Sequence, residues 1–292
     1  MATKRLPRPL FGVPAPDFAM HDPATALASI FRPVCRGRRP KGLDVTYAFD
    51  GLSLRFVNFE WLDVREQSIL LACCALAGIS SQDLDREASG KIGQQLWLDL
   101  EPKEKAVIDR AIVVTTSYYQ LLESAGLPTR GADFERVKEM LFRLASTSCR
   151  AKKDGYDWSM RLLSYAARPD GSISIALNGR FAAALAGQHI RTSLKERQAL
   201  PSEIAELTHC YLTAWIREGH HQRVKLDTLA GKVWGIESAN TETIRKRRER
   251  IGDALRAIGQ LPGWRTEIEG RGEHAMATIW RVRVKDVLPS AG

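Results

Sequence analysis

A pattern within residues 224–261 places the strongest constraint on how this chain can fold. A short apolar segment, VKLDTLAGKVWG, is followed by a turn and then by the longer segment TETIRKRRERIGDALRAI. In the longer segment four apolar residues recur at intervals of 7, 4 and 3: Ile244, Ile251, Leu255 and Ile258. This spacing places them on one side of an α-helix. The pattern predicts two helices joined by a turn, with the second helix burying one side.

The basic residues of the second helix are predicted to lie on its exposed flanks, because the apolar stripe faces the core. A helix of this kind, preceded by a shorter helix and a turn, is typical of DNA recognition in the major groove. Asn240 and Thr241 stand where N-cap residues and early groove contacts are found. The alternative is a solvated amphipathic helix whose charges keep the protein soluble. The predicted DNA-binding residues of the helix are Asn240, Thr241, Thr243, Arg245, Lys246, Arg247, Arg248 and Arg250.

The residues after this helix predict a β-hairpin. Residues 264–268 and 277–285 alternate apolar and polar side chains and are joined by a glycine-containing turn. A hairpin after a recognition helix is the wing of a winged-helix domain. We expect Trp280 to point to one face of the second strand, and Arg281 and Arg283 to point to the other face, along DNA phosphates.

A similar order of elements occurs earlier in the chain. Residues 115–125 and 133–145 predict two helices, and the second is amphipathic. Residues 158–165 and 172–177 then predict a hairpin that begins, like the later one, near a tryptophan. The helix at 133–145 carries balanced charges, so a packing or dimer-forming role is as consistent with it as base contact.

The two copies predict an α+β protein with two winged-helix domains in tandem. A flexible, basic and proline-rich arm is expected at residues 1–41. The N-terminal winged-helix domain is expected at residues 42–178, beginning with a hairpin around Asp50-Gly51. The C-terminal DNA-binding domain is expected at residues 179–292.

Composition agrees with a soluble protein that binds a polyanion. The 292 residues are 44% hydrophobic and 26% charged, with a formal net charge of +9. The five cysteines form no C-x-x-C pair, and their odd number argues against a disulfide framework, so we expect a reducing cytoplasm. The apolar run ILLACCALAGI is too short to span a bilayer, and we expect no signal peptide before it.

Several segments resemble the RepC-type replication initiators of IncQ-like plasmids, which bind repeated origin sequences called iterons. These segments are HDPATALA from His21, LDVTY from Leu43, LEPKEKAV from Leu100, RLLSY from Arg161, LDTLAGKVW from Leu226 and TIRKRRERIGDAL from Thr243. The resemblance implies a pair of winged-helix domains, the C-terminal one binding iteron DNA and the N-terminal one assisting DNA contact or self-association. It also implies origin opening and recruitment of a plasmid-encoded helicase and primase.

The sequence lacks the patterns expected of an enzyme. A nicking enzyme needs a tyrosine nucleophile and two histidines around one apolar residue to hold a metal ion. Tyr118-Tyr119 supplies only the nucleophile. His220 and His221 are adjacent and would face opposite sides of a strand. No phosphate-binding G-x-x-x-x-G-K-[ST] loop is present. We therefore predict no catalytic residue, no metal and no cofactor.

These observations predict a non-enzymatic replication initiator that binds double-stranded iteron DNA. Arg247 or Arg250 is expected to pair with guanine, and Lys246 and Arg245 with phosphates. The alternatives are a winged-helix transcriptional repressor without a role in replication and a rolling-circle nickase. The iteron sequence, the oligomeric state and the helicase-contacting surface are left open.

Overall fold

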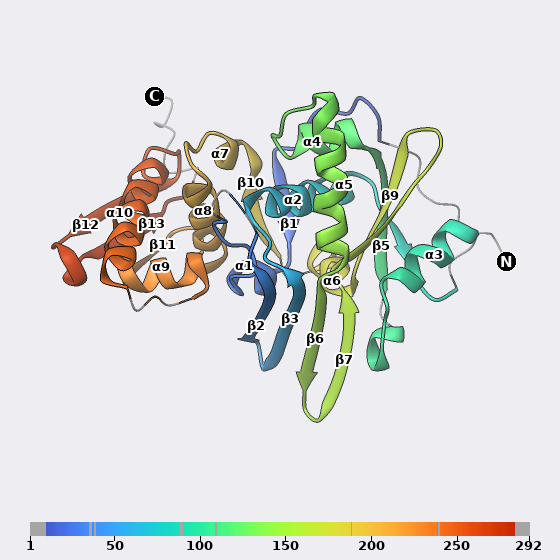
Figure 1. Ribbon diagram of the computed structural model, residues 1–292, viewed down its shortest axis with the longest axis horizontal. Coiled ribbons are helices and arrows are strands. Elements are labelled where there is room, and N and C mark those ends of the chain that lie inside the picture. The colour runs from blue at the N-terminus through green and yellow to red at the C-terminus, as the bar shows by residue number, and fades with distance from the viewer. Residues whose placement is uncertain are drawn as a thin grey trace, which may run out of the picture. The chain divides into compact units, whose positions relative to one another are not determined.

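The computed structural model describes residues 10–34, 37, 39–87, 90–108, 110–187, 189–236, 238 and 240–283. The chain mixes helices with small antiparallel sheets and divides into two compact units (Figure 1). Unit 1 consists of residues 1–30 and 34–194, and unit 2 of residues 31–33 and 195–292.

The division between the units lies later in the chain than the predicted boundary near residue 178. Strand β10 (Ile190–Ser193) pairs with β1 (Phe18–His21), which holds the segment after residue 178 within unit 1. The arm prediction is also corrected, because β1 and the short helix α1 (Pro23–Leu27) are built from residues expected to be flexible. Residues 1–9, 35, 36 and 38 of the predicted arm lie outside the described residues.

Unit 1 contains two four-stranded antiparallel sheets, with strand orders β2-β3-β6-β7 and β4-β5-β9-β8. In the first sheet the predicted hairpin around Asp50-Gly51 is confirmed. Besides the elements already given, unit 1 contains β2 (Lys41–Phe49), β3 (Leu52–Glu60), α2 (Val64–Ile79), β4 (Gln82–Leu84), α3 (Lys91–Asp99), the 3-10 helix η1 (Glu104–Ile108), β5 (Ala111–Ser117), α4 (Tyr118–Ser124), α5 (Gly131–Ala145), β6 (Ser148–Lys153), β7 (Tyr156–Arg161), β8 (Leu163–Ala167), β9 (Ser172–Leu177) and α6 (Gly179–Ala186).

Unit 2 has one three-stranded antiparallel sheet of order β11-β13-β12, and helix α10 packs against α8, α9 and β12. The predicted short helix before the turn is confirmed as α9, whereas β11 was not predicted as a strand. The elements of this part of the chain are α7 (Leu194–Gln198), which begins at the division, α8 (Glu203–Trp215), β11 (His220–Lys225), α9 (Leu226–Trp234), α10 (Thr241–Ile258), β12 (Trp264–Glu269), the 3-10 helix η2 (Gly272–His274) and β13 (Met276–Arg281).

The same order of elements occurs in both units. In unit 2 it is α8, β11, α9, α10, β12 and β13, with β13 as the central strand. In unit 1 it is α2, β5, α4, α5, β8 and β9, with β9 between β5 and β8. In each unit the first helix packs against the following two helices. Unit 1 differs by carrying β4, α3 and η1 between α2 and β5, and the hairpin β6-β7 between α5 and β8, which joins the other sheet (Figure 1).

This insertion corrects the predicted first hairpin. Trp158 lies on β7, which pairs with β6, whereas the strand that forms a hairpin with β9 is β8. The chain changes sheets at the fully buried Leu162, whose N–H donates to Thr147 O and whose carbonyl accepts from Asn178 N. Residues 158–165 therefore show one continuous alternating pattern but belong to two strands, β7 and β8, which lie in different sheets. Thr115–Ser117, predicted as helix, instead form the end of β5.

Helix α2 is the most buried helix of unit 1 and is fixed at its start by a capping box. Asp63 Oδ1 accepts from Glu66 N at 3.4 Å, and Glu66 Oε2 accepts from Asp63 N at 2.7 Å. The run that contains Cys73 and Cys74 is buried, as predicted, and both thiols are free. No helix in the described ranges combines the length and apolar character needed to cross a membrane.

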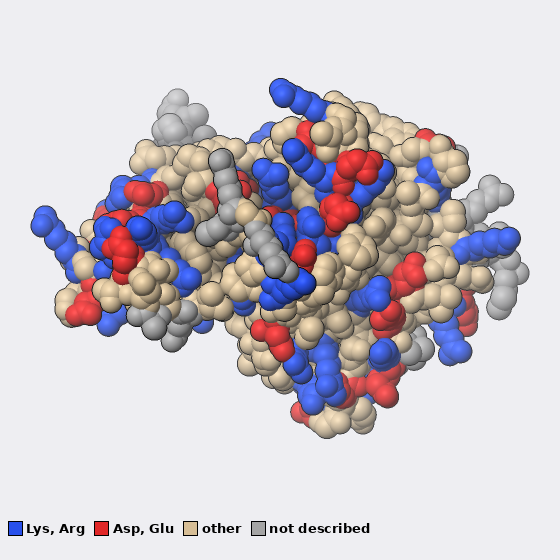
Figure 2. All heavy atoms as spheres, in the orientation of Figure 1, with Lys and Arg blue, Asp and Glu red and all other residues tan. Residues whose placement is uncertain are grey.

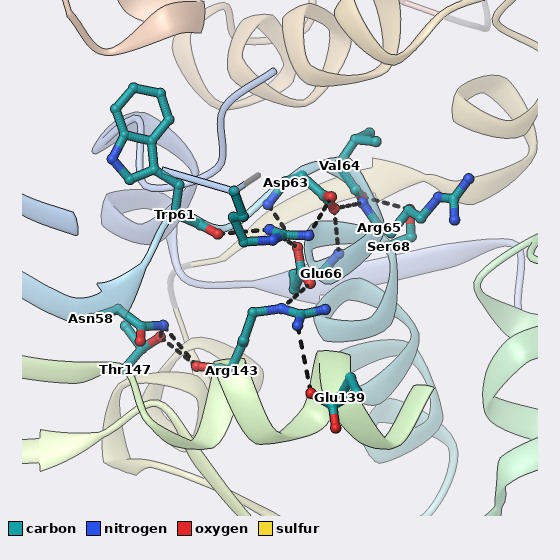
Figure 3. A network of polar contacts seen from close by, with 11 residues as sticks. Asn58, Trp61, Asp63, Val64, Arg65, Glu66, Ser68, Glu139, Arg143 and Thr147 are labelled. Atoms are coloured by element: carbon teal, nitrogen blue, oxygen red, sulfur yellow. Dashed lines mark hydrogen bonds and ion pairs between the residues drawn. The ribbon is translucent and has the colours of Figure 1, made fainter. Parts of the chain in front are cut away.

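The Glu66 carboxylate lies at the centre of a buried polar network (Figure 3). Arg143 Nε of α5 donates to Glu66 Oε1 at 2.7 Å, and Arg39 Nη1 donates to Glu66 Oε2 at 3.1 Å. Arg39 also donates to Asp63 Oδ2 at 2.7 Å and to Trp61 O at 2.6 Å. The network therefore joins the segment before β2, the start of α2 and the end of α5.

The pKa of Glu66 is raised to about 7, chiefly by burial and then by the Asp63 carboxylate, against the lowering effect of the Arg143 and Arg39 guanidinium groups. The folded protein therefore holds a proton on Glu66 more tightly than the unfolded chain does. In the window between the unfolded pKa of 4.5 and about 7, this group makes the free energy of unfolding fall as the pH rises.

We predict that Glu66→Gln changes the pH dependence of stability in that window. From pH 5 to pH 8 the free energy of unfolding of the wild type should fall by roughly 1–3 kcal/mol relative to that of the variant, because the variant has no proton to release at this position. Urea unfolding at several pH values measures the difference, and contributions of other groups cancel between the two proteins. A difference that stays constant over the whole range would show that Glu66 is ionised throughout.

Candidate nucleic-acid interface

Helix α10 is buried through its C-terminal half and exposed through its N-terminal half. Ile251, Leu255 and Ile258 are fully buried, which confirms most of the predicted stripe, while Ile244 is half-buried. Gly235, the C-cap of α9, adopts a left-handed conformation with φ of 63°, and this directs the chain into the turn before α10. The basic residues 245–250 therefore project from the half of the helix that the core does not enclose.

Arg248 is turned toward the protein. Its guanidinium donates from Nε to Asp227 Oδ1 at 2.8 Å and from Nη2 to Oδ2 at 2.6 Å, and only 17% of the side chain is exposed. Asp227 lies in the first turn of α9, where a carboxylate is favourable. This two-pronged pair joins α9 to α10. Arg248 was predicted to bind DNA, but in the structure it fixes the angle between the two helices. Its partner Asp227 lies 21 positions earlier and was not predicted.

Arg245 and Lys246 are exposed and paired with acidic residues of the same helix. Arg245 donates to Glu242 at 2.8 Å and also contacts Glu249, and Lys246 lies 3.3 Å from Glu242. Figure 2 shows acidic and basic side chains intermixed over the region of α10. Exposed pairs of this kind are weak because water and salt screen them, so a phosphate can replace the carboxylate partner.

Arg247 and Arg250 lie on the flank of α10 that was predicted to read bases. Arg247 Nη1 donates to Ile236 O at 2.7 Å, and its guanidinium stands 5.3 Å from the centre of the Trp234 ring. Arg250 is exposed, and no carboxylate of the described residues pairs with it. Of the two arginines expected to contact guanine, Arg250 is the one whose guanidinium is available without breaking an internal contact.

The predicted start of the helix is confirmed. Asn240 is the N-cap, and its Oδ1 accepts from Thr243 N at 3.0 Å. Thr241 is the first helical residue and is exposed, whereas Thr243 is half-buried on the same flank as Arg247 and Arg250. These three polar residues place hydrogen-bonding groups at the exposed end of α10.

The structure corrects the predicted faces of β13. Arg281 shares the inner face with the buried Ala277 and Ile279, and its side chain is 15% exposed. Its Nη1 donates to Thr213 O at 2.9 Å and to Ile216 O at 3.1 Å, which satisfies carbonyls at the end of α8. Because this group is engaged in the interior, Arg281 is not presented for phosphate contact.

The outer face of the sheet carries Trp280 instead. Its ring stacks on His221 at 6.0 Å and lies 5.0 Å from the Arg265 guanidinium. Arg283 is exposed and follows β13, so it keeps the position expected of a residue beside the DNA backbone. Lys285, expected on the same strand, lies outside the described residues.

The corresponding helix of unit 1, α5, presents its charges differently. Arg136 pairs with Asp133 at 2.8 Å, Lys138 pairs with Glu135 at 2.6 Å, and Arg143 belongs to the buried Glu66 network. The exposed Phe142 lies beside Phe59, with 5.7 Å between ring centres. The exposed side of α5 is therefore closer to neutral and partly aromatic.

Groups considered for catalysis are dispersed. His220 and His221 lie at successive positions of β11 opposite Arg281 and Trp280, so they face opposite sides, as predicted. Tyr119 is exposed on α4, and Tyr118 lies near Lys138. Within the described ranges, no three His, Cys, Asp or Glu side chains are grouped so as to hold a metal ion.

The chain is similar to a known protein family and to solved structures. The sequence matches the family model for Replication protein C (RepC) over residues 15–276. No curated protein matches the sequence. Among solved structures, selenomethionine derivatives of domain 2 and domain 3 of RctB match with a TM-score of 0.55 at 10% identity, covering 89% of this chain and 98% of that chain. The Pi initiator protein in complex with iteron DNA gives a TM-score of 0.41 at 10% identity, and the match covers 91% of this chain and 97% of that chain. The likeness to the RctB domains is one of fold.

We predict that Arg248→Met destabilises unit 2 more than a matched change at an exposed arginine of the same helix. Loss of Arg248 leaves the half-buried Asp227 carboxylate without its partner, at a cost of about 1–2 kcal/mol. Arg256→Met removes only an exposed pair with Asp253 and should cost about 0.5 kcal/mol or less. Urea unfolding followed by tryptophan fluorescence compares the two, and equal losses would contradict a bracing role for Arg248.

Proposed function

This chain belongs to the RepC family of replication proteins, and we propose that it is a plasmid replication initiator that binds iteron repeats as double-stranded DNA through unit 2. The observation that carries the proposal is the exposed half of α10. It combines an uncommitted Arg250 with Lys246 and Arg247 on a helix whose other half is locked into the core. A rigid helix of this composition suits entry into a major groove.

We propose that unit 2 is a winged-helix domain. The order α8, β11, α9, α10, β12, β13, with β13 as the central strand, supports this assignment, and α10 then takes the place of the recognition helix. The turn of the β12-β13 hairpin and the exposed Arg283 are its wing contacts. Unit 1 repeats the order and is proposed to be a second winged-helix domain.

Arg250 is proposed as the residue that reads a guanine edge, because its guanidinium does not have to break an ion pair with a carboxylate of the described residues in order to bind the base. Lys246 and Arg245 are proposed as phosphate contacts that exchange their glutamate partners for the DNA backbone. Asn240, Thr241 and Thr243 are placed to contact the backbone or base edges at the start of the helix. Arg247 is proposed to assist by holding the turn before α10.

The remaining steps of initiation are proposed for the whole chain rather than for a mapped site. Unit 1 assists DNA contact or self-association, which agrees with the paired charges of α5 and with the exposed aromatic pair that its Phe142 forms with Phe59 of β3. Origin opening then draws on binding energy or on the recruited helicase and primase. We propose no enzymatic activity for this chain.

Binding by base reading predicts different effects for two variants. The cognate duplex is first selected from a randomised pool with wild-type protein, and a shuffled duplex of equal length serves as reference. Arg250→Ala should weaken cognate binding by about 1–3 kcal/mol and relax the preference at one base pair. Lys246→Ala should weaken both duplexes alike and lower the salt slope by about one unit. Arg256→Ala, on the same helix, is the control.

Fluorescence anisotropy at several salt concentrations gives these affinities. If Arg250→Ala weakened the cognate and shuffled duplexes equally, α10 would not read bases through this residue. If wild-type protein selected no sequence from the pool, the proposal of iteron recognition would be wrong.

A replication assay separates an initiator from a repressor. The chain is supplied in trans to a plasmid whose origin contains the selected repeats, and plasmid maintenance is measured. We expect maintenance with wild type and Arg256→Ala and loss with Arg250→Ala. Binding to the repeats without maintenance of the plasmid would support a transcriptional repressor.

A further inference from the structure

A short segment far from α10 in the sequence belongs to the same unit. Residues 31–33 group with unit 2, although the chain on both sides of them belongs to unit 1. Phe31 and Arg32 are buried, with 6% and 5% of their surfaces exposed. An arginine is rarely this buried unless its guanidinium is used. Burial also lowers the pKa of Arg32 from its ordinary value.

The Arg32 guanidinium lies against Gly235. A Cβ atom added to this glycine would lie 2.6 Å from Arg32 Nε, 2.9 Å from Nη2 and 3.0 Å from Cζ. The φ of 63° at Gly235 separately disfavours any residue with a side chain. The close packing of Arg32 on the bare backbone of Gly235 therefore depends on glycine at that position.

Gly235 is the point from which the chain turns into α10. Its N–H donates to Gly231 O at 2.8 Å and closes α9. The neighbouring Trp234 is buried, and Ile236 O accepts from Arg247 Nη1 at 2.7 Å. The turn is thus held by Arg247 from α10 and by Arg32 from a segment two hundred positions earlier in the chain.

We propose that Arg32 is a positioning residue for DNA recognition: by packing on Gly235 it fixes the turn between α9 and α10 and thereby the approach of Arg250 to a base pair. This inference rests on the proposed function of α10. Sequence preference requires the base-reading side chain to be placed more accurately than backbone attraction requires. Loss of Arg32 should therefore reduce discrimination more than general affinity.

The test compares Arg32→Met with the charge-matched control Arg256→Met, using the selected duplex and the shuffled duplex at several salt concentrations. Arg32→Met should lose roughly tenfold in cognate affinity relative to the control, about the effect of one mismatched base pair. Its affinity for the shuffled duplex and its salt slope should equal those of the control. Arg32→Lys, which keeps the charge but lacks the planar guanidinium, should lose discrimination in the same direction. Gly235→Ala should also lose it, because its Cβ displaces Arg32.

Three results would overturn the inference. Equal losses on both duplexes with a salt slope lower by about one unit would make Arg32 a direct phosphate contact. Equal losses accompanied by a lower Tm in Arg32→Met and Arg32→Lys would make its role one of stability alone. Unchanged discrimination in all three variants would remove any role in recognition. Absence of preference in the wild type itself would instead refute the proposed function, so the two failures are distinguishable.

Discussion

The burial of Ile251, Leu255 and Ile258 against α8, α9 and β12 is the constraint on which the rest of unit 2 depends. With these side chains in the core, the rotation of α10 about its axis is set, and each basic residue of its first half acquires a fixed direction. Arg248 then meets Asp227 inside the unit, whereas Arg250 points to solvent. A helix with the same charges but a different stripe would present another set of arginines.

The two units show how one arrangement of elements can carry two surfaces. In both, a pair of helices follows one strand, β5 or β11, and precedes two more strands of the same sheet, β8 and β9 or β12 and β13. In unit 1 the cations of α5 are matched by carboxylates, and one of them, Arg143, is drawn into the buried network around Glu66. In unit 2 the cations of α10 outnumber their partners. The difference lies in side chains at equivalent places, which agrees with separate roles for the two units.

Periodicity identified the helices around the proposed recognition turn and both strands of the following hairpin, because each is defined by a local pattern with one buried side. It failed where the deciding contact is distant in the sequence. Arg281 alternates as an outward residue would, yet the carbonyls at the end of α8 accept its hydrogen bonds in the interior. Trp158 and Leu163 belong to one continuous pattern but to two sheets. The proline-rich composition before residue 41 predicted flexibility, whereas pairing of β1 with β10 holds part of that segment.

The central position of β13 has a consequence for co-translational folding. β11 and β12 each pair with β13 and not with each other. Arg281, at the end of β13, donates a hydrogen bond to a carbonyl near the end of α8, the first long helix of the unit. During synthesis α10 therefore emerges before the strand that completes the sheet. The three-stranded sheet of unit 2 can be completed only after residues up to Arg281 have left the exit tunnel, so nascent chains are expected to lack this sheet until that moment.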